Sequence, residues 1–124
     1  MAVISEGSNL GDLLKYEAPS FYSRDTVTVA SGQNLVLGAV VGIKTADGKV
    51  HTLDPAATDG TETAAGVLLQ AVNATSADVD AVMVTRHALV ADVALVWPAG
   101  ITTNQKSAAI AHLKGIGILI RKGA

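Results

Sequence analysis

The sequence predicts a β-rich α+β fold: a small, compact, β-barrel-like domain with one short C-terminal helix and an extended N-terminal arm. Three observations lead to this prediction. Short runs of β-branched and apolar residues alternate with clusters of Gly, Asp, Asn and Thr along most of the chain. A helix-capping signal marks the start of a predicted helix over residues 102–113, near the C-terminus. Residues 1–25 are polar and broken by Gly, Ser and Pro, which divides the chain into an arm (1–25) and a domain (26–124).

The composition limits both the core and the function. The chain has 124 residues, enough for one domain, and it is 49% hydrophobic but only 3% aromatic. The core must therefore consist mainly of Val, Ala, Leu and Ile, which suit closely packed sheets. The net charge of -2 argues against general nucleic-acid binding. The absence of cysteine excludes disulfides and thiol chemistry and suits assembly in a reducing cytoplasm.

The arm contains three of the four aromatic residues of the chain, Tyr16, Phe21 and Tyr22. Disordered tails rarely concentrate the large side chains that dominate interfaces, so these residues are candidate anchors. They could hold the arm on a partner, on a neighbouring subunit or on the domain itself. We expect that deletion of residues 1–22 leaves a folded domain.

The domain begins with a succession of predicted strands. In the middle of them, Asp47-Gly48 has the residues of a two-residue hairpin turn, so the strand after it should return antiparallel to the one before it. A loop rich in turn formers follows over 54–63. The predicted strands are residues 26–29, 35–43, 49–53, 66–72 and 79–90, and residues 88–97 are also expected to be extended.

The C-terminal end predicts one helix and a last strand. Trp97-Pro98 stops the preceding strand, and Thr102 with Gln105 has the form of a capping box. The helix should end near Leu113, before Gly115. An apolar strand over 116–120 then closes the chain.

The residues give no support for catalysis or for a cofactor. The three histidines, His51, His87 and His112, lie far apart and have no second ligand at a metal-binding spacing, which favours structural roles. Asp78-Val79-Asp80 lacks the remaining ligands of a calcium loop. No nucleophile elbow or phosphate-binding glycine motif is present. The longest uncharged apolar run, 35–43, is too short to cross a bilayer, so no membrane partner is expected.

Two features keep alternative interpretations open. Trp97, with Pro98, could cap the core or anchor a subunit interface. The charge is also uneven, because residues 61–100 are mainly acidic whereas 101–124 contain only bases, and these regions could pair between subunits or simply be solvated. The bases are Lys106, Lys114, Arg121 and Lys122.

The order of several short motifs resembles the head decoration proteins of lambda-type tailed phages. The motifs are Thr58-Asp59-Gly60, Gly66-Val67-Leu68, Val96-Trp97-Pro98, the helix from Thr102 to Leu113, and the strand from Ile116 to Ile120. Each motif alone is weak, and the resemblance rests on their order over about residues 26–121. The chain departs from the family between Thr61 and Gly66, in the low charge of the helix and in the sequence of the arm.

This resemblance implies a structural protein with no enzymatic activity. It implies a homotrimer at three-fold positions on the outer surface of an expanded phage capsid, with the arm on the major capsid protein and no direct contact with DNA. The composition alone leaves two other classes open: a small β-barrel ligand-binding or accessory module of a cellular complex, and a hydrolase with scattered catalytic residues.

Overall fold

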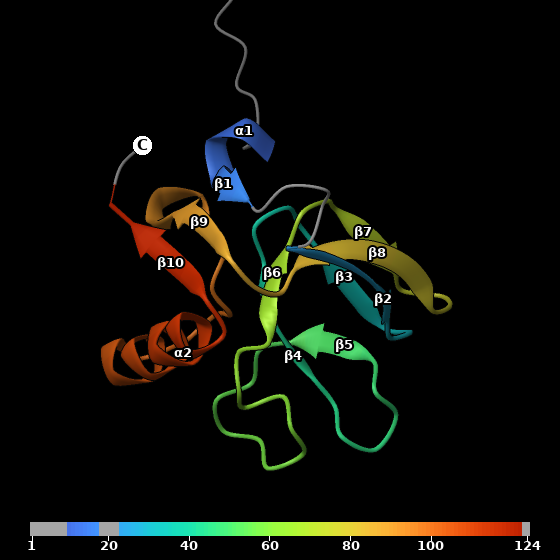
Figure 1. Ribbon diagram of the computed structural model, residues 1–124. Coiled ribbons are helices and arrows are strands. Elements are labelled where there is room, and N and C mark those ends of the chain that lie inside the picture. Colours follow the sequence, from blue (N-terminus) through green and yellow to red (C-terminus); the bar gives the residue numbers. More distant parts are fainter. Residues whose placement is uncertain (1–9, 18–22, 123–124) are drawn as a thin grey trace, which may run out of the picture.

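A closed five-stranded barrel forms the centre of the molecule (Figure 1). The computed structural model describes residues 10–17 and 23–122. The strand order around the barrel is β2-β5-β4-β6-β8. These strands are β2 (Arg24–Val29), β4 (Val40–Ile43), β5 (Val50–Thr52), β6 (Gly66–Leu68) and β8 (Val79–Val84). The predicted β-rich, barrel-like fold is confirmed.

The longest strand pair of the barrel is antiparallel, between β2 and β8. It runs from Arg24 opposite Val84 to Val29 opposite Val79. Small and β-branched side chains fill the barrel, as the aromatic-poor composition predicts. Its fully buried members are Val29, Val41, Val50, Leu68 and Met83.

Three of the predicted strands are each broken into two. Residues 35–43 divide into the end of β3 (Gln33–Leu35) and β4, because Gly38 adopts a φ of +88° between them. A Cβ atom at Gly38 would collide with the carbonyl oxygen of Ala94. This close approach places Ala39 beside Val96 in a parallel bridge, which local alternation of apolar residues does not encode.

The other two breaks occur at residues 69–71 and 85–87. After β6 the chain turns into β7 (Val72–Ala74), which pairs with β3. After β8 it turns into β9 (Ala88–Ala91), and β9 belongs to a different sheet. His87 has a φ of +48° in this second turn, a value that continuous strand cannot have.

The predicted hairpin around Asp47-Gly48 is confirmed in its pairing but not in its turn. Strand β5 runs antiparallel to β4, with Val41 opposite Thr52. The turn is longer than two residues, because the amide of Gly48 donates to the carbonyl of Lys44 at 2.8 Å and Gly48 itself adopts a φ of +69°.

A three-stranded sheet lies beside the barrel, in the order β1-β9-β10. Strand β1 (Leu14–Glu17) follows a single helical turn, α1 (Leu10–Leu13), and β10 (Ile118–Arg121) ends the described chain. Leu13 is fully buried. Residues 10–17 therefore pack as part of the domain, although the sequence assigns them to the arm.

Helix α2 (Thr103–Gly115) confirms the predicted C-terminal helix. Thr102 is its N-cap, and the predicted capping box is formed with Gln105, through bonds of 3.1 and 3.0 Å. The extended segment expected over 88–97 is interrupted by a 3₁₀ helix, η2 (Asp92–Ala94).

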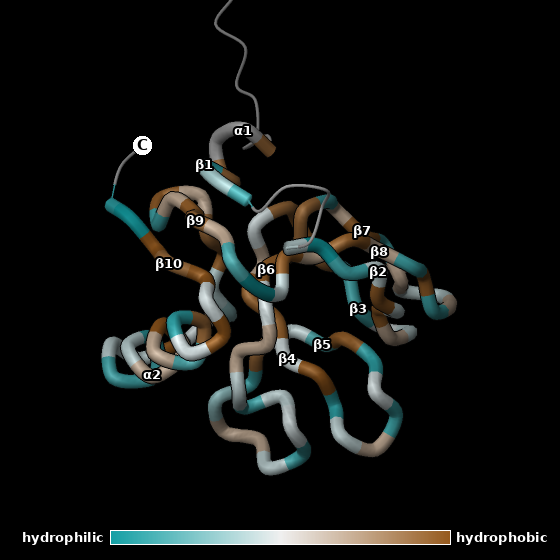
Figure 2. The backbone as a smooth tube through the Cα atoms, in the orientation of Figure 1, coloured by the Kyte–Doolittle hydropathy of each residue, from teal (hydrophilic) through white to brown (hydrophobic). Residues whose placement is uncertain are grey.

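A second core joins the three-stranded sheet and α2 to the barrel. Each of these elements contributes fully buried side chains to it, among them Leu13, Val67, Val90, Leu113 and Ile118. Brown, apolar segments concentrate on the strands, whereas the loops below β4 and β5 are mostly pale with scattered teal and the end of β10 is teal (Figure 2). This core fixes the position of the sheet whose other face is exposed.

Candidate functional site

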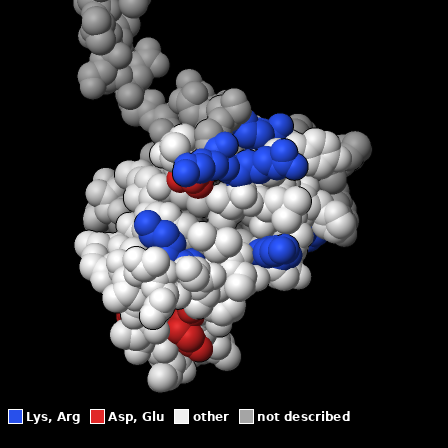
Figure 3. Space-filling model, turned by 90° about the vertical axis from the view of Figure 1, so that its left-hand side faces the viewer, with Lys and Arg blue, Asp and Glu red and all other residues white. Residues whose placement is uncertain are grey.

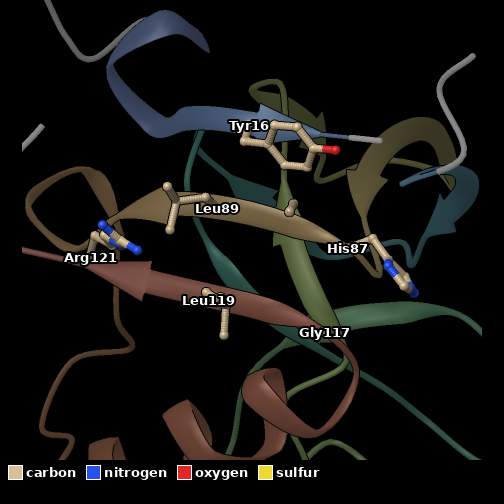
Figure 4. Close-up of a pocket in the computed structure, with 7 residues that line it drawn as sticks. Tyr16, His87, Leu89, Gly117, Leu119 and Arg121 are labelled. Carbon is tan, nitrogen blue, oxygen red and sulfur yellow. The ribbon is translucent and has the colours of Figure 1, made fainter. Parts of the chain in front are cut away.

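A row of three apolar side chains crosses the outer face of the β1-β9-β10 sheet. Tyr16 lies opposite Leu89, and Leu89 lies beside Leu119, so the three residues occupy one register line. Tyr16 is 57% exposed and Leu119 is 47% exposed. Figure 4 shows the three side chains on adjacent strands. Large apolar residues gathered on an exposed sheet face are typical of an interaction surface.

The alternation of strand residues explains why this row faces outward. Ala88 and Val90 flank Leu89 and are buried, and Ile118 is fully buried before Leu119. The pairing of β1 shifts register after Leu14, so Tyr16 is the residue that comes opposite Leu89. The sheet therefore turns one face to the core and this row to the surface.

A shallow groove of about 350 Å³ runs along the apolar row. His87 and Gly117 line one end of it, and Arg121 lines it on β10. The two backbone turns at the first end are locked together: the amide of Ala88 donates to the carbonyl of Gly117 at 3.1 Å, and Gly117 has a φ of +87°. Ser23, fully buried, donates its hydroxyl to the carbonyl of His87 at 2.7 Å. These two hydrogen bonds fix the backbone at the His87 and Gly117 end of the groove.

A second groove, of about 330 Å³, lies between α2 and β10. Ile110 and Lys114 line it from the helix, and Ile120 lines it from the strand. Leu119 and Arg121 line both grooves. Strand β10 is thus bordered by a groove on each side.

The charged groups around β10 are basic. Residues 101–124 contain four Lys and Arg residues and no Asp or Glu. Of these bases, Lys114, Arg121 and Lys122 are exposed. On the side of the molecule shown in Figure 3, Lys and Arg side chains border an uncharged area and acidic side chains are few. The surface therefore combines apolar area with positive charge, although the whole chain is weakly acidic.

The structure separates the candidate residues that the sequence singles out. Tyr16 lies on the apolar row, whereas Phe21 and Tyr22 lie outside the described residues. Trp97 is partly buried against the second core, with the Lys106 ammonium 5.6 Å from its ring centroid. Pro98 lines a different groove, beside Pro55.

Sequence reasoning did not identify Leu89 or Leu119 as surface residues, and it named Arg121 only as one of the C-terminal bases. A signal for Leu119 was present, because every second residue of a strand faces the same side and Ile118 and Ile120 could fill the core positions. Leu89 had no such signal, since its neighbours are all small or apolar and its sheet is formed from three distant segments.

His112 and Asp78, which the sequence also singles out, have structural partners. The Nδ1 atom of His112 accepts a hydrogen bond from the amide of Ala64 at 3.2 Å. Asp78 forms a 2.6 Å ion pair with Lys49, and the hydrogen bond from Lys49 lowers the pKa of this carboxyl group. Within residues 10–17 and 23–122, no three His, Cys, Asp or Glu side chains are arranged to hold a metal ion. None of the described helices is long and apolar enough to span a bilayer.

Comparison with protein families decides what kind of protein carries this surface. The family model described as bacteriophage lambda head decoration protein D matches residues 3–118. The chain belongs to this family. Comparison with individual curated proteins gives no significant match. The head decoration family consists of structural proteins of the phage capsid, so the chain has a role in capsid decoration and associates with the virion head.

Proposed function

We propose that this protein is a cement protein that binds as a homotrimer to the outer surface of the expanded phage head, at three-fold positions, after assembly in the host cytoplasm. Its partners are the major capsid protein and two further copies of itself. Its binding stabilises the shell against the pressure of packaged DNA without contact with that DNA. The observation that carries this proposal is the family match over residues 3–118.

General physical principles make attachment through an N-terminal arm plausible. An extended arm gains main-chain hydrogen bonds when it adds to the edge of a partner sheet. A trimer presents three arms, and attachment of the first raises the effective concentration of the other two. We propose Tyr16, Phe21 and Tyr22 as anchors for the capsid, and Trp97 with Pro98 as an anchor of the core or the trimer. The contact of Trp97 with the second core supports the core role.

The structure changes the design of the truncation that tests the arm. Deletion of residues 1–22 removes Leu13, which is fully buried, and all of β1, which pairs with β9. We therefore expect this deletion to unfold the domain, contrary to the sequence-based expectation. Deletion of residues 1–9 leaves the packed segment in place and removes only residues that precede Leu10.

The test is co-sedimentation of the purified protein with expanded and unexpanded capsids of its own phage, together with a mass measurement in solution. We expect a trimer that binds expanded capsids only. The 1–9 deletion keeps Tyr16, Phe21 and Tyr22 and should stay folded and trimeric, but it should bind more weakly because it lacks the main-chain bonds proposed for residues 1–9. A monomer that binds neither capsid form would contradict the proposal. If the 1–9 deletion bound expanded capsids as tightly as the unaltered protein, residues 1–9 would not contribute to the capsid contact.

A ligand-binding module has less support from the geometry. Of the aromatic residues in the described part of the chain, Tyr16 alone lines the groove on the apolar row. That groove is shallow and lies on a sheet face rather than inside the barrel. Pockets for small molecules are usually concave and enclosed by apolar and aromatic side chains.

A further inference from the structure

The outer edge of β10 is open to a further strand. The sheet order is β1-β9-β10, so β10 pairs with β9 on one side, and within the described residues no strand pairs with its other side. An edge strand presents backbone N–H and C=O groups that can bind the backbone of another chain. Figure 1 shows β10 running away from α2 toward its C-terminal end. The edge is therefore most accessible near Leu119 and Arg121.

The two grooves beside β10 match the geometry of an added strand. Successive side chains of an extended segment point to opposite faces of the sheet. A segment paired with β10 would place one set of side chains over the apolar row, next to Leu119, and the other set toward Ile110 and Ile118 between strand and helix. Main-chain bonds then supply affinity and the grooves supply selectivity for alternate side chains.

The charges around this edge favour an added strand that carries acidic side chains. Among the residues that the structure describes, no Asp or Glu lines either groove. Lys114, Arg121 and Lys122 are exposed, and no ion pair within the described part of the chain involves them. Acidic groups on the bound segment would therefore meet positive charge without displacing an existing partner.

The position of the edge relates it to the proposed capsid contact. Residues 1–9 join the domain at α1, which leads directly into β1 of the same sheet. Strand β1 and the open edge of β10 thus belong to one sheet, in which β9 lies between them. A partner in contact with β1 has one strand, β9, to cross to this edge.

We propose that β10 accepts, as an added strand, an extended segment of the major capsid protein that carries apolar side chains at alternate positions and at least one Asp or Glu. This inference rests on the proposed function and assigns a second contact to it, in addition to the arm. Leu119 supplies the apolar contact, Arg121 supplies the charge, and the edge of β10 supplies the backbone hydrogen bonds.

The test compares two surface variants with matched controls in the full chain, using purified expanded capsids as the probe. Leu119→Ser removes the apolar contact, and Val79→Ser is its control because Val79 is also an apolar residue at the surface of a strand, at 38% exposure. Arg121→Glu reverses the charge, and Lys44→Glu is its control, because Lys44 lies in the turn between β4 and β5 and lines neither groove. Thermal unfolding and solution mass verify fold and assembly, and hydrogen exchange follows the amides of residues 118–121.

We expect about tenfold weaker capsid binding for Leu119→Ser and about fivefold weaker binding for Arg121→Glu, with both controls close to the unaltered protein. Among residues 118–121, the amides on the open edge, which do not bond to β9, should exchange slowly only on capsids. Normal binding by both surface variants would overturn this inference and leave the proposed function intact. Slow exchange in the free protein, with loss of the trimer in the variants, would assign the edge to a second copy and also overturn it. Failure of the unaltered protein to bind would overturn both.

Discussion

The guanidinium group of Arg24 donates two hydrogen bonds, each of 2.7 Å, to the carboxylate of Glu17. Glu17 is the last residue of β1 and Arg24 is the first residue of β2, so this pair joins the three-stranded sheet to the barrel. Both side chains are largely buried, at 25% and 19% exposure. The hydrogen bonds from Arg24 to Glu17 raise the pKa of the guanidinium.

The first prediction is that Glu17→Gln lowers the free energy of unfolding by about 1 kcal/mol, because a neutral amide replaces one side of a charge-assisted bidentate pair. Urea unfolding at neutral pH measures the change. Asp80→Asn is the control, since Asp80 is exposed and accepts one 3.2 Å bond from Thr28. If both variants lost the same free energy of unfolding, the bidentate pair would contribute no more to stability than a single exposed hydrogen bond.

The second prediction concerns pH. Hydrogen bonding from Arg86, followed by that from Thr85, lowers the pKa of Asp25 in the folded state. Its contribution is therefore fully present above the unfolded-state pKa of about 3.9 and is lost as the pH falls through the lower folded-state value. The side chain of Asp25 is 42% exposed, so the contribution at neutral pH is about 0.5 kcal/mol.

Asp25→Asn tests this linkage. The unaltered protein should be more stable than the variant at pH 7, and the difference should shrink toward zero as the pH falls below 4. Denaturant unfolding of both proteins at several pH values measures it. A difference that is constant between pH 7 and pH 3 would contradict the assignment to the charged carboxylate.

The third prediction concerns close backbone packing. A Cβ atom at Gly42 would lie 2.7 Å from the Cα atom of Thr61, so Gly42→Ala should destabilise the fold by about 1–3 kcal/mol through displacement of the 54–63 loop. Gly115→Ala is the control, because no atom lies within 4 Å of its Cβ position and Gly115 is the last residue of α2. The control should be neutral or slightly stabilising. Thermal unfolding ranks the two, and the reverse ranking would refute the packing explanation.

The fourth prediction concerns the start of α2. Thr102→Ala removes the hydroxyl that accepts from the amide of Gln105, at 3.1 Å, and should cost about 1 kcal/mol. Thr103→Ala, one residue later, removes an exposed hydroxyl within the first turn and should change stability much less. Circular dichroism during thermal unfolding compares them. If both substitutions cost the same, the capping box does not set the stability of the helix end.

Local signals predicted those elements whose stability is local. The capping box at Thr102 and the antiparallel return after Asp47-Gly48 depend on residues that lie within a few positions of one another, and both are confirmed. The three broken strands show where such signals end. For example, the apolar run over 35–43 is interrupted at Gly38, where the backbone lies close to the carbonyl of Ala94, a residue distant in sequence.

The candidate surface was only partly predictable for the same reason. Tyr16 was singled out as a rare aromatic residue, but its partner Leu89 and the third member Leu119 come from strands far along the chain. Their alignment depends on the register shift in β1 and on the turns at His87 and Gly117. No short-range pattern encodes an alignment of three strands.

The sequence by itself determined the composition of the core, the capped C-terminal helix and the resemblance to phage head decoration proteins, because side-chain type and short-range spacing are properties of the chain. Only the tertiary structure decided that residues 10–17 pack against the domain, and that Tyr16, Leu89 and Leu119 form one row on the outer face of a sheet. Burial of Leu13 decides the first, and the pairing of β9 with β1 and with β10 decides the second, because both depend on segments that are distant in sequence.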